Sequence, residues 1–270
     1  MITAHAQIRY AVGQNVAPVF EGWERNADGS FSFVFGYMNR NYEEEVDVPV
    51  GADNGFSVNA DRGAADPGVD IDRGQPAHFY PRRQQFVFKV RVPKDWGRKD
   101  LVWTLTSHGK TEKAYASLMP VWEIDAGTYQ QNRGGPGELG EPDDPPAITL
   151  NGAADRAIAV GEPLTLSTTV TDDGRPTARR SGSGSNPRVE GPLKQAVVKL
   201  DPDMRLGVIW IVYRGDASAV TFDPRKVKVA NGKADTVVRC SEPGMYVLRG
   251  YADDGILWDA VDVKLACTRR

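Results

Sequence analysis

The chain has 270 residues, of which 40% are hydrophobic and 26% charged, and its formal net charge is −3. This length suffices for two domains of ordinary size, and the near balance of charge argues against a nucleic-acid-binding protein, which would usually carry a basic face. The sequence has no apolar run approaching the roughly eighteen residues of a membrane span.

The first half of the chain alternates apolar and polar residues with a period of two. Residues 30–38, 84–92 and 101–107 each place aromatic or aliphatic side chains on one face, which predicts half-buried antiparallel strands. Weaker strands are expected near residues 8–12, 17–23, 43–50, 112–117 and 119–124. Residues 51–76 are rich in Gly, Asp and Asn and are expected to form a long loop. These patterns predict an N-terminal β-sandwich domain over residues 7–125.

The second half begins after a stretch that predicts a linker. Residues 126–146 contain nine Gly or Pro residues and hardly any apolar ones. Short strands with turn signals between them follow, at 147–150, 157–160, 163–171, 206–213, 218–222, 226–230, 234–240, 245–252 and 256–266. We therefore expect an immunoglobulin-like β-sandwich over residues 147–268, with a basic insert at 174–205, in an all-β protein of two sandwich domains.

Several stretches of the second half, taken as an ordered set, resemble PKD-type and related bacterial Ig-like modules. They are GEPLTL from residue 161, TDDG from 171, Trp210 within an apolar strand, EPGMYVLR from 242 and ADDG from 252. We expect Trp210, which shares a face with Val208 and Val212, to fill the sandwich core, and the Tyr246 hydroxyl to bond to the backbone in a tyrosine corner. The chain as a whole is similar to a family of secreted bacterial proteins, a resemblance that implies no activity.

Two features favour an extracytoplasmic protein. Residues Ala4, His5 and Ala6 have the small-x-small form of a signal-peptidase site, which would start the mature protein at Gln7; the alternative is chance. Cys240 and Cys267 end two strands that lie at the same pole of an Ig-like topology. They therefore predict a disulfide, with two separate thiols in a cytosolic protein as the alternative.

The motifs of common enzymes are missing from the sequence. It contains no Gly-x-Ser-x-Gly, no His-Glu-x-x-His and no phosphate-binding glycine loop, so we expect no catalysis and no cofactor. Loop carboxylates at Asp143, Asp144, Asp253 and Asp254 are candidate calcium ligands, although Asp-Gly pairs also form turns without a metal. A hydrolase using loop carboxylates is a further alternative, but the sequence does not single out a pair.

Aromatic residues in loops are candidates for a sugar-binding platform. The candidates are Trp23, Trp96, Trp122, Tyr42 and Tyr129. Trp96 lies in the polar turn PKDWGRK and is the hardest to explain as a core residue, although a tryptophan can also cap the end of a sandwich.

The strand at 206–213 predicts an interaction surface. Ile209, Ile211 and Tyr213 lie opposite the Trp210 face and should be covered by the first domain, by the insert or by another chain. The insert has seven basic residues against three acidic ones, and Arg179 and Arg180 are candidates for docking an acidic partner; the alternative is a solvated loop.

These observations predict a non-catalytic extracytoplasmic protein with a structural, adhesion or complex-accessory role, which binds a protein partner or a second copy of itself. A carbohydrate-binding accessory module is the alternative. The compartment is expected to be the periplasm, the cell surface or the exterior.

Overall fold

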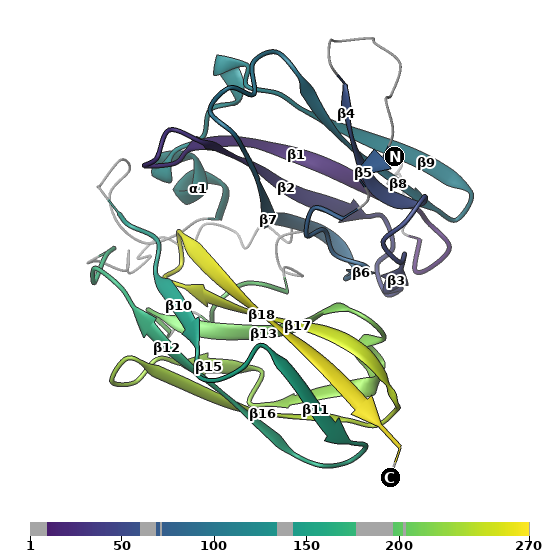
Figure 1. Cartoon of the computed structure of the whole chain (residues 1–270), viewed down its shortest axis with the longest axis vertical. Helices are drawn as coiled ribbons and strands as arrows, with labels where there is room; N and C mark the ends of the chain where they lie inside the picture. Colours follow the sequence, from purple (N-terminus) through teal and green to yellow (C-terminus); the bar gives the residue numbers. More distant parts are fainter. Residues whose placement is uncertain are drawn as a thin grey trace, which may run out of the picture. The chain divides into compact units, whose positions relative to one another are not determined.

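The computed structural model describes residues 10–59, 69–70, 72–133, 143–176, 197–201 and 204–269 (Figure 1). The chain divides into two compact units. Unit 1 comprises the described residues of 10–75 and 79–122, and unit 2 comprises residues 76–78 and the described residues from 123 onward. Arg179 and Arg180 lie outside the described residues.

Unit 1 is built from antiparallel strands in two main sheets. One sheet has the order β1-β2-β7, and the other has the order β5-β4-β8-β9. Their bounds are β1 Val16–Arg25, β2 Phe31–Asn39, β7 Arg82–Val92, β4 Asn54–Asn59, β5 Val69–Asp70, β8 Asp100–Ser107 and β9 Lys110–Ala116. A two-stranded pair joins β3 Val46–Asp47 to β6 His78–Phe79. The sequence correctly predicts the strands with the strongest period-two pattern, which are β2, β7 and β8.

The core of unit 1 is aromatic. Phe35 stacks on Phe88 with ring centroids 5.4 Å apart, and Phe56 stacks on Trp103 at 5.8 Å. Phe35 and Trp103 meet edge to face at 5.9 Å, which joins the two sheets. Such pairs are worth about 0.5–1.5 kcal/mol each beyond their buried area. The large rings that alternate along β2 and β7 therefore specify how the two sheets pack.

Three expectations for unit 1 are wrong. The weak strand expected near residues 8–12 is not found, because the described residues 10–12 form no strand. The predicted loop at 51–76 contains the core strand β4, whose Phe56 is fully buried. The short period-two run GFSV was obscured by the Gly and Asp residues around it. The predicted strand near 119–124 is instead a 3-10 turn, η1 (Pro120–Trp122), because the proline at its start cannot contribute an N–H to a sheet.

Unit 2 is an immunoglobulin-like β-sandwich, and the predicted all-β fold class is confirmed. One sheet has the order β10-β12-β16-β14 and the other has the order β11-β18-β17-β13-β15, in which β11 runs parallel to β18. The strands are β10 Ala147–Leu150, β11 Asp155–Ala159, β12 Leu164–Thr171, β13 Gly207–Arg214, β14 Val220–Asp223, β15 Lys226–Lys228, β16 Lys233–Cys240, β17 Gly244–Asp253 and β18 Trp258–Thr268. A 3-10 turn, η3 (Ala217–Ala219), precedes β14.

The core of unit 2 contains the residues that the sequence singled out. Trp210 is fully buried in one cluster with Val208 and Val212, and its ring stacks on Phe222 at 6.3 Å. The Tyr246 hydroxyl donates to the Glu242 carbonyl oxygen at 3.0 Å, as a tyrosine corner requires. Both contacts are as predicted from the sequence.

The predicted disulfide is confirmed. Cys240 and Cys267 are bonded, with an S–S distance of 2.07 Å. Because β16 and β18 belong to different sheets, the bridge joins the two layers of the sandwich at one pole.

The predicted linker is partly helical. Residues Ala126–Arg133 form α1, which counts with unit 2. The Arg133 guanidinium donates to the Ile256 carbonyl oxygen at 2.9 Å and pairs with the buried Asp253 carboxylate. No helix among the described residues has the length and apolar character needed to cross a membrane.

Candidate functional site

The far face of β13 is not an exposed apolar strip. Ile209, Ile211 and Tyr213 are all buried, as expected of a strand face that is covered, and their role in binding a partner stays a prediction. The Arg249 guanidinium lies 3.5 Å from the centre of the Tyr213 ring and forms two hydrogen bonds with Asp262, at 2.6 and 2.7 Å. Burial raises the pKa of Tyr213 well above its usual range. These side chains serve packing within the protein.

The candidate calcium ligands are Asp143, Asp144, Asp253 and Asp254. Asp253 pairs with Arg133, and Asp254 Oδ1 accepts hydrogen bonds from the backbone amides of Ile256 and Leu257, at 2.6 and 2.8 Å. Within the part of the chain that the structure describes, no group of three or more His, Cys, Asp or Glu side chains is placed to hold a metal ion. The alternative reading, turn formation, fits the geometry at Asp253 and Asp254.

Most of the aromatic candidates are core residues, including Trp96. Its side chain is only 5% exposed, its ring meets Phe33 edge to face at 5.7 Å, and its indole N–H donates to the Lys99 carbonyl oxygen at 2.9 Å. A ring held in this way offers no platform to a ligand. Trp23 and Tyr129 are also buried, whereas Trp122 is 47% exposed.

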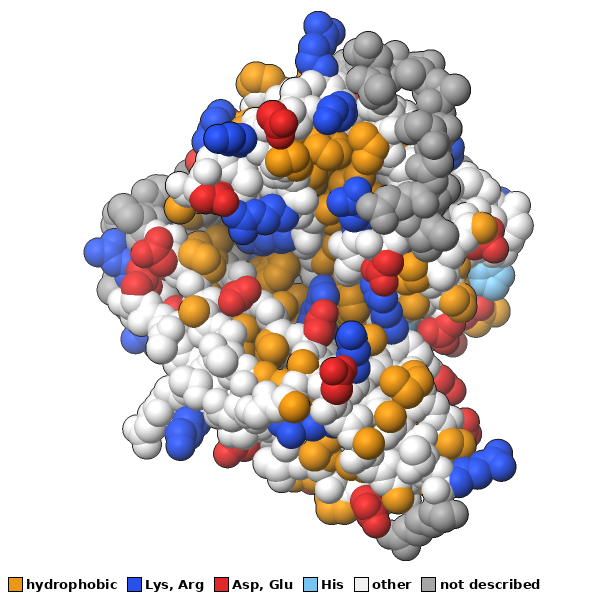
Figure 2. All heavy atoms as spheres, viewed as in Figure 1, with side chains coloured by type: hydrophobic (Ala, Val, Ile, Leu, Met, Phe, Trp, Pro, Cys, Tyr) orange, Lys and Arg blue, Asp and Glu red, His pale blue; other side chains and the backbone are white. Residues whose placement is uncertain are grey.

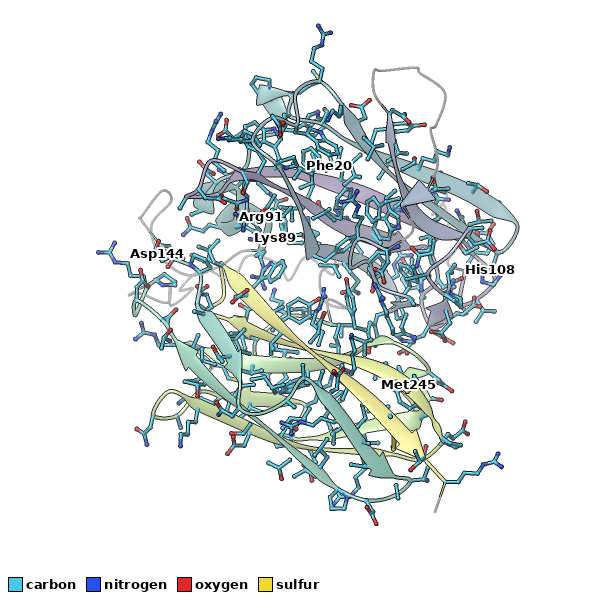
Figure 3. The ribbon with its side chains drawn as sticks, in the orientation of Figure 1. Phe20, Lys89, Arg91, His108, Asp144 and Met245 are labelled. Atoms are coloured by element: carbon cyan, nitrogen blue, oxygen red, sulfur yellow. A yellow bond between two sulfur atoms is a disulfide. The ribbon has the colours of Figure 1, made fainter. Side chains whose placement is uncertain are left out.

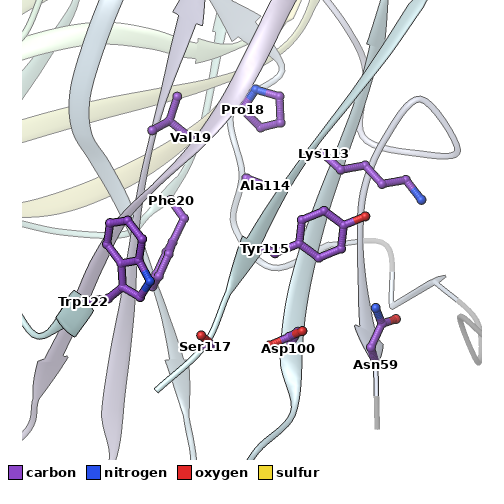
Figure 4. A pocket seen from close by; sticks show the side chains of 10 residues that line it. All are labelled: Pro18, Val19, Phe20, Asn59, Asp100, Lys113, Ala114, Tyr115, Ser117 and Trp122. Atoms are coloured by element: carbon purple, nitrogen blue, oxygen red, sulfur yellow. The ribbon is translucent and has the colours of Figure 1, made fainter. Parts of the chain in front are cut away.

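Trp122 lies beside a groove between the edge strands of the two sheets of unit 1. β1 is the outer strand of one sheet and β9 is the outer strand of the other. The two sheets are joined at one end, where the Val16 amide of β1 donates to Ser107 Oγ of β8 at 2.8 Å. The side-chain amide of Asn15, directly before β1, donates to Glu112 of β9 at 3.1 Å. Farther along the strands a cavity of about 570 Å³ opens between them (Figure 4). This volume lies within the range of small-ligand sites.

Aromatic side chains form the walls of this groove. Phe20 and Trp122 lie next to each other, with ring centroids 6.2 Å apart, and Tyr115 projects from β9 (Figure 4). Tyr115 is 55% exposed. Tyr115 was not among the aromatic residues predicted from the sequence, although the small residues Ala114 and Ala116 on the inner face of β9 indicate that the ring between them points outward.

Polar side chains form a row at one end of the groove. Asn59 of β4 and Asp100 of β8 are partners in the sheet register, and Ser117 follows β9 directly beside them (Figure 4). Asp100 is buried, and Asn59 Oδ1 is a buried atom with no hydrogen-bond partner among the described residues. Lys113 extends from the other end of the lining. The groove therefore offers aromatic faces and hydrogen-bonding groups to the same ligand.

The groove is held by the surrounding fold. The buried Trp23 indole N–H donates to the Met119 carbonyl oxygen at 2.8 Å, and the Trp122 amide donates to the same carbonyl at 2.9 Å. Phe20 packs edge to face on Phe33 at 5.6 Å. The Phe20 side chain and the backbone of Trp122 are therefore held by the surrounding fold, which lowers the entropy lost when a ligand binds.

Comparisons with known proteins do not identify a family. No family model matches the chain, and no curated protein matches it. Among solved structures, a titin–obscurin-like 1 Ig complex has a TM-score of 0.28 at 10% identity, covering 48% of this chain and 98% of the other. Two domains of the S-layer protein SbsC have a TM-score of 0.27 at 10% identity, covering 63% of this chain and 65% of the other. Likenesses of this strength transfer no residue roles.

Proposed function

We propose that the chain is a non-catalytic, extracytoplasmic binding protein with an adhesion or complex-accessory role. In this proposal unit 1 binds the ligand through its groove, and unit 2 is a disulfide-stabilised scaffold. We also propose that unit 2 is a PKD-like module.

The proposal rests mainly on where the exposed hydrophobic side chains cluster. The large hydrophobic residues that the described chain exposes are Tyr10, Val12, Tyr115, Met119, Val121, Trp122 and Met245. Four of these seven lie on β9 or in the segment up to Trp122 that follows it, and two of the four, Tyr115 and Trp122, line the groove. Exposed apolar patches of this kind mark interaction sites, and tyrosine, tryptophan and methionine are enriched in them.

Two further observations support the compartment and the absence of catalysis. The disulfide uses both cysteines of the chain, and structural disulfides persist in oxidising compartments. Asp100 is the single carboxylate in the described lining of the groove, whereas glycoside hydrolysis generally needs a pair. The groove therefore favours binding over hydrolysis.

The test is binding of purified protein to washed cell envelopes of the source organism. Trp122→Ala and Tyr115→Ala should each weaken binding about tenfold or more, because exposed tryptophan and tyrosine side chains carry much of the energy of an interface. Met245→Ala is the matched control, since Met245 is an exposed hydrophobic residue of unit 2 and does not line the groove (Figure 3). Equal binding by wild type and both groove variants would refute the proposal.

A further inference from the structure

We propose that the ligand of the groove is a neutral oligosaccharide, an inference that rests on the proposed binding function. A pyranose ring has C–H groups on its faces and hydroxyl groups around its edge. Aromatic rings can pack against the faces, while carboxylate, amide and hydroxyl side chains bond to the edge. Phe20, Tyr115 and Trp122 supply the rings (Figure 4).

The polar row supplies the partners for the hydroxyl groups. The Asp100 carboxylate and the Ser117 hydroxyl can accept hydrogen bonds, and Asn59 presents a buried amide oxygen that no described residue engages. An apolar ligand that covered Asn59 and Ser117 would offer their polar groups no hydrogen-bond partner, which is unfavourable. A ligand rich in hydroxyl groups avoids that cost.

The strand edges that border the groove disfavour a peptide added as an extra β-strand. Pro18 lies in β1 beside the groove and has no N–H, while Lys113 projects from β9. Proline and lysine on edge strands are the usual protection against strand addition. Recognition at this position therefore depends on side chains, which suits a glycan better than an extended polypeptide.

The charges of the groove favour an uncharged ligand. Its lining contains one cationic side chain, Lys113, and one anionic side chain, Asp100. Basic and acidic side chains are also interspersed over the face of the molecule seen in Figure 2. A polyanion would meet Asp100, and a polycation would meet Lys113, so neither gains a consistent attraction.

The experiment tests whether the ligand in the envelope is a glycan or a protein. Binding of the full chain is measured to envelopes treated with a broad-specificity protease, to envelopes oxidised with periodate, and to untreated envelopes. Periodate should reduce binding at least tenfold, because it cleaves vicinal diols of sugars, and protease should leave binding within twofold. Protein-free glycan released from the same envelopes should compete with wild-type binding and should bind Trp122→Ala at least tenfold more weakly.

Tyr115→Phe separates a stacking role from a general effect on folding. It keeps the ring and should retain binding within about threefold, whereas Tyr115→Ala should lose it. Sensitivity to protease with no effect of periodate or of released glycan would overturn the oligosaccharide and leave the proposed binding function standing. Binding that is unchanged in Trp122→Ala and Tyr115→Ala would overturn both the oligosaccharide ligand and the proposed binding function.

Discussion

Asp254 is a buried carboxyl group in an unusual setting. It lies directly after β17, is 2% exposed, and borders a cavity of about 270 Å³ that Asp172 and Arg205 also line. Burial, together with the nearby Asp143 and Asp253 carboxylates, raises its pKa to about 8. Burial and the adjacent Asp173 likewise raise the pKa of Asp172.

The raised pKa makes the stability of unit 2 depend on pH. The protonated form of Asp254 is favoured in the folded protein, so its contribution is complete below the usual pKa of 3.8 and is lost as the pH rises toward 8. Asp254→Asn keeps the oxygen that accepts the Ile256 and Leu257 amides and removes the buried charge. The variant should melt at a higher temperature than wild type at pH 9, and the difference should shrink as the pH falls toward 4.

The control for this prediction is Asp144→Asn. It makes the same change of charge at an exposed side chain, and it should leave the pH dependence of melting unchanged (Figure 3). If Asp254→Asn and wild type lose stability equally between pH 5 and pH 9, the raised pKa is refuted.

At the scale of single residues, the sequence was informative about the core and less so about the groove. Trp210 and Tyr246 could be placed because a period-two pattern or a turn fixes the direction of each side chain. The sequence favoured Trp96 over Trp122 as the exposed ring because Trp96 lies in a polar turn, whereas the structure buries Trp96 and leaves Trp122 47% exposed. Burial there depends on whether a core ring such as Phe33 comes within reach, which only the tertiary fold decides.

Elements with strong local patterns were predicted well, and those defined by tertiary pairing were not. The nine expected strand segments of unit 2 all overlap observed strands. β4 was missed because its pairing with β8, rather than its own composition, makes it a strand. The helix α1 lies in a stretch read as linker, and its Arg133 is held by the buried Asp253, a contact invisible to local patterns.

The pairing of β13 with β17 depends on a glycine. Gly250 is opposite Trp210 in the register, and a Cβ added to it would lie 2.9 Å from Trp210 Cζ2. Because the tryptophan is fully buried, it cannot move aside freely. Gly250→Ala should therefore destabilise unit 2 by about 1–3 kcal/mol, measured by urea unfolding.

Gly51→Ala is the matched control, because a Cβ at Gly51 would meet no atom within 4 Å. It should change the free energy of unfolding by less than about 0.5 kcal/mol. An effect of Gly250→Ala no larger than that of the control would contradict the close contact with Trp210.

At the scale of the whole molecule, each unit has its own core and only unit 2 contains cysteine. Calorimetry should therefore resolve two unfolding transitions. Reduction should lower the free energy of unfolding of unit 2 by about 3–4 kcal/mol, the value expected for a loop of 27 residues. It should leave the transition of unit 1 in place.

The double variant Cys240→Ala/Cys267→Ala should reproduce the effect of reductant and be insensitive to it. A reductant that shifts both transitions together, or neither, would contradict the assignment of the disulfide to a separately folding unit.

The disulfide also decides how unit 2 responds to a pulling force. Cys240 and Cys267 enclose β17 and nearly all of β18 in a covalent loop. Tension applied to the chain beyond Cys267 passes through the sulfur bridge into β16, so the enclosed residues bear none of it. The stretched chain would be shorter by roughly 90 Å than its residue count implies, since 27 residues stay looped. For a protein anchored at one end and bound to a surface through unit 1, this loop would limit how far the chain can extend under load.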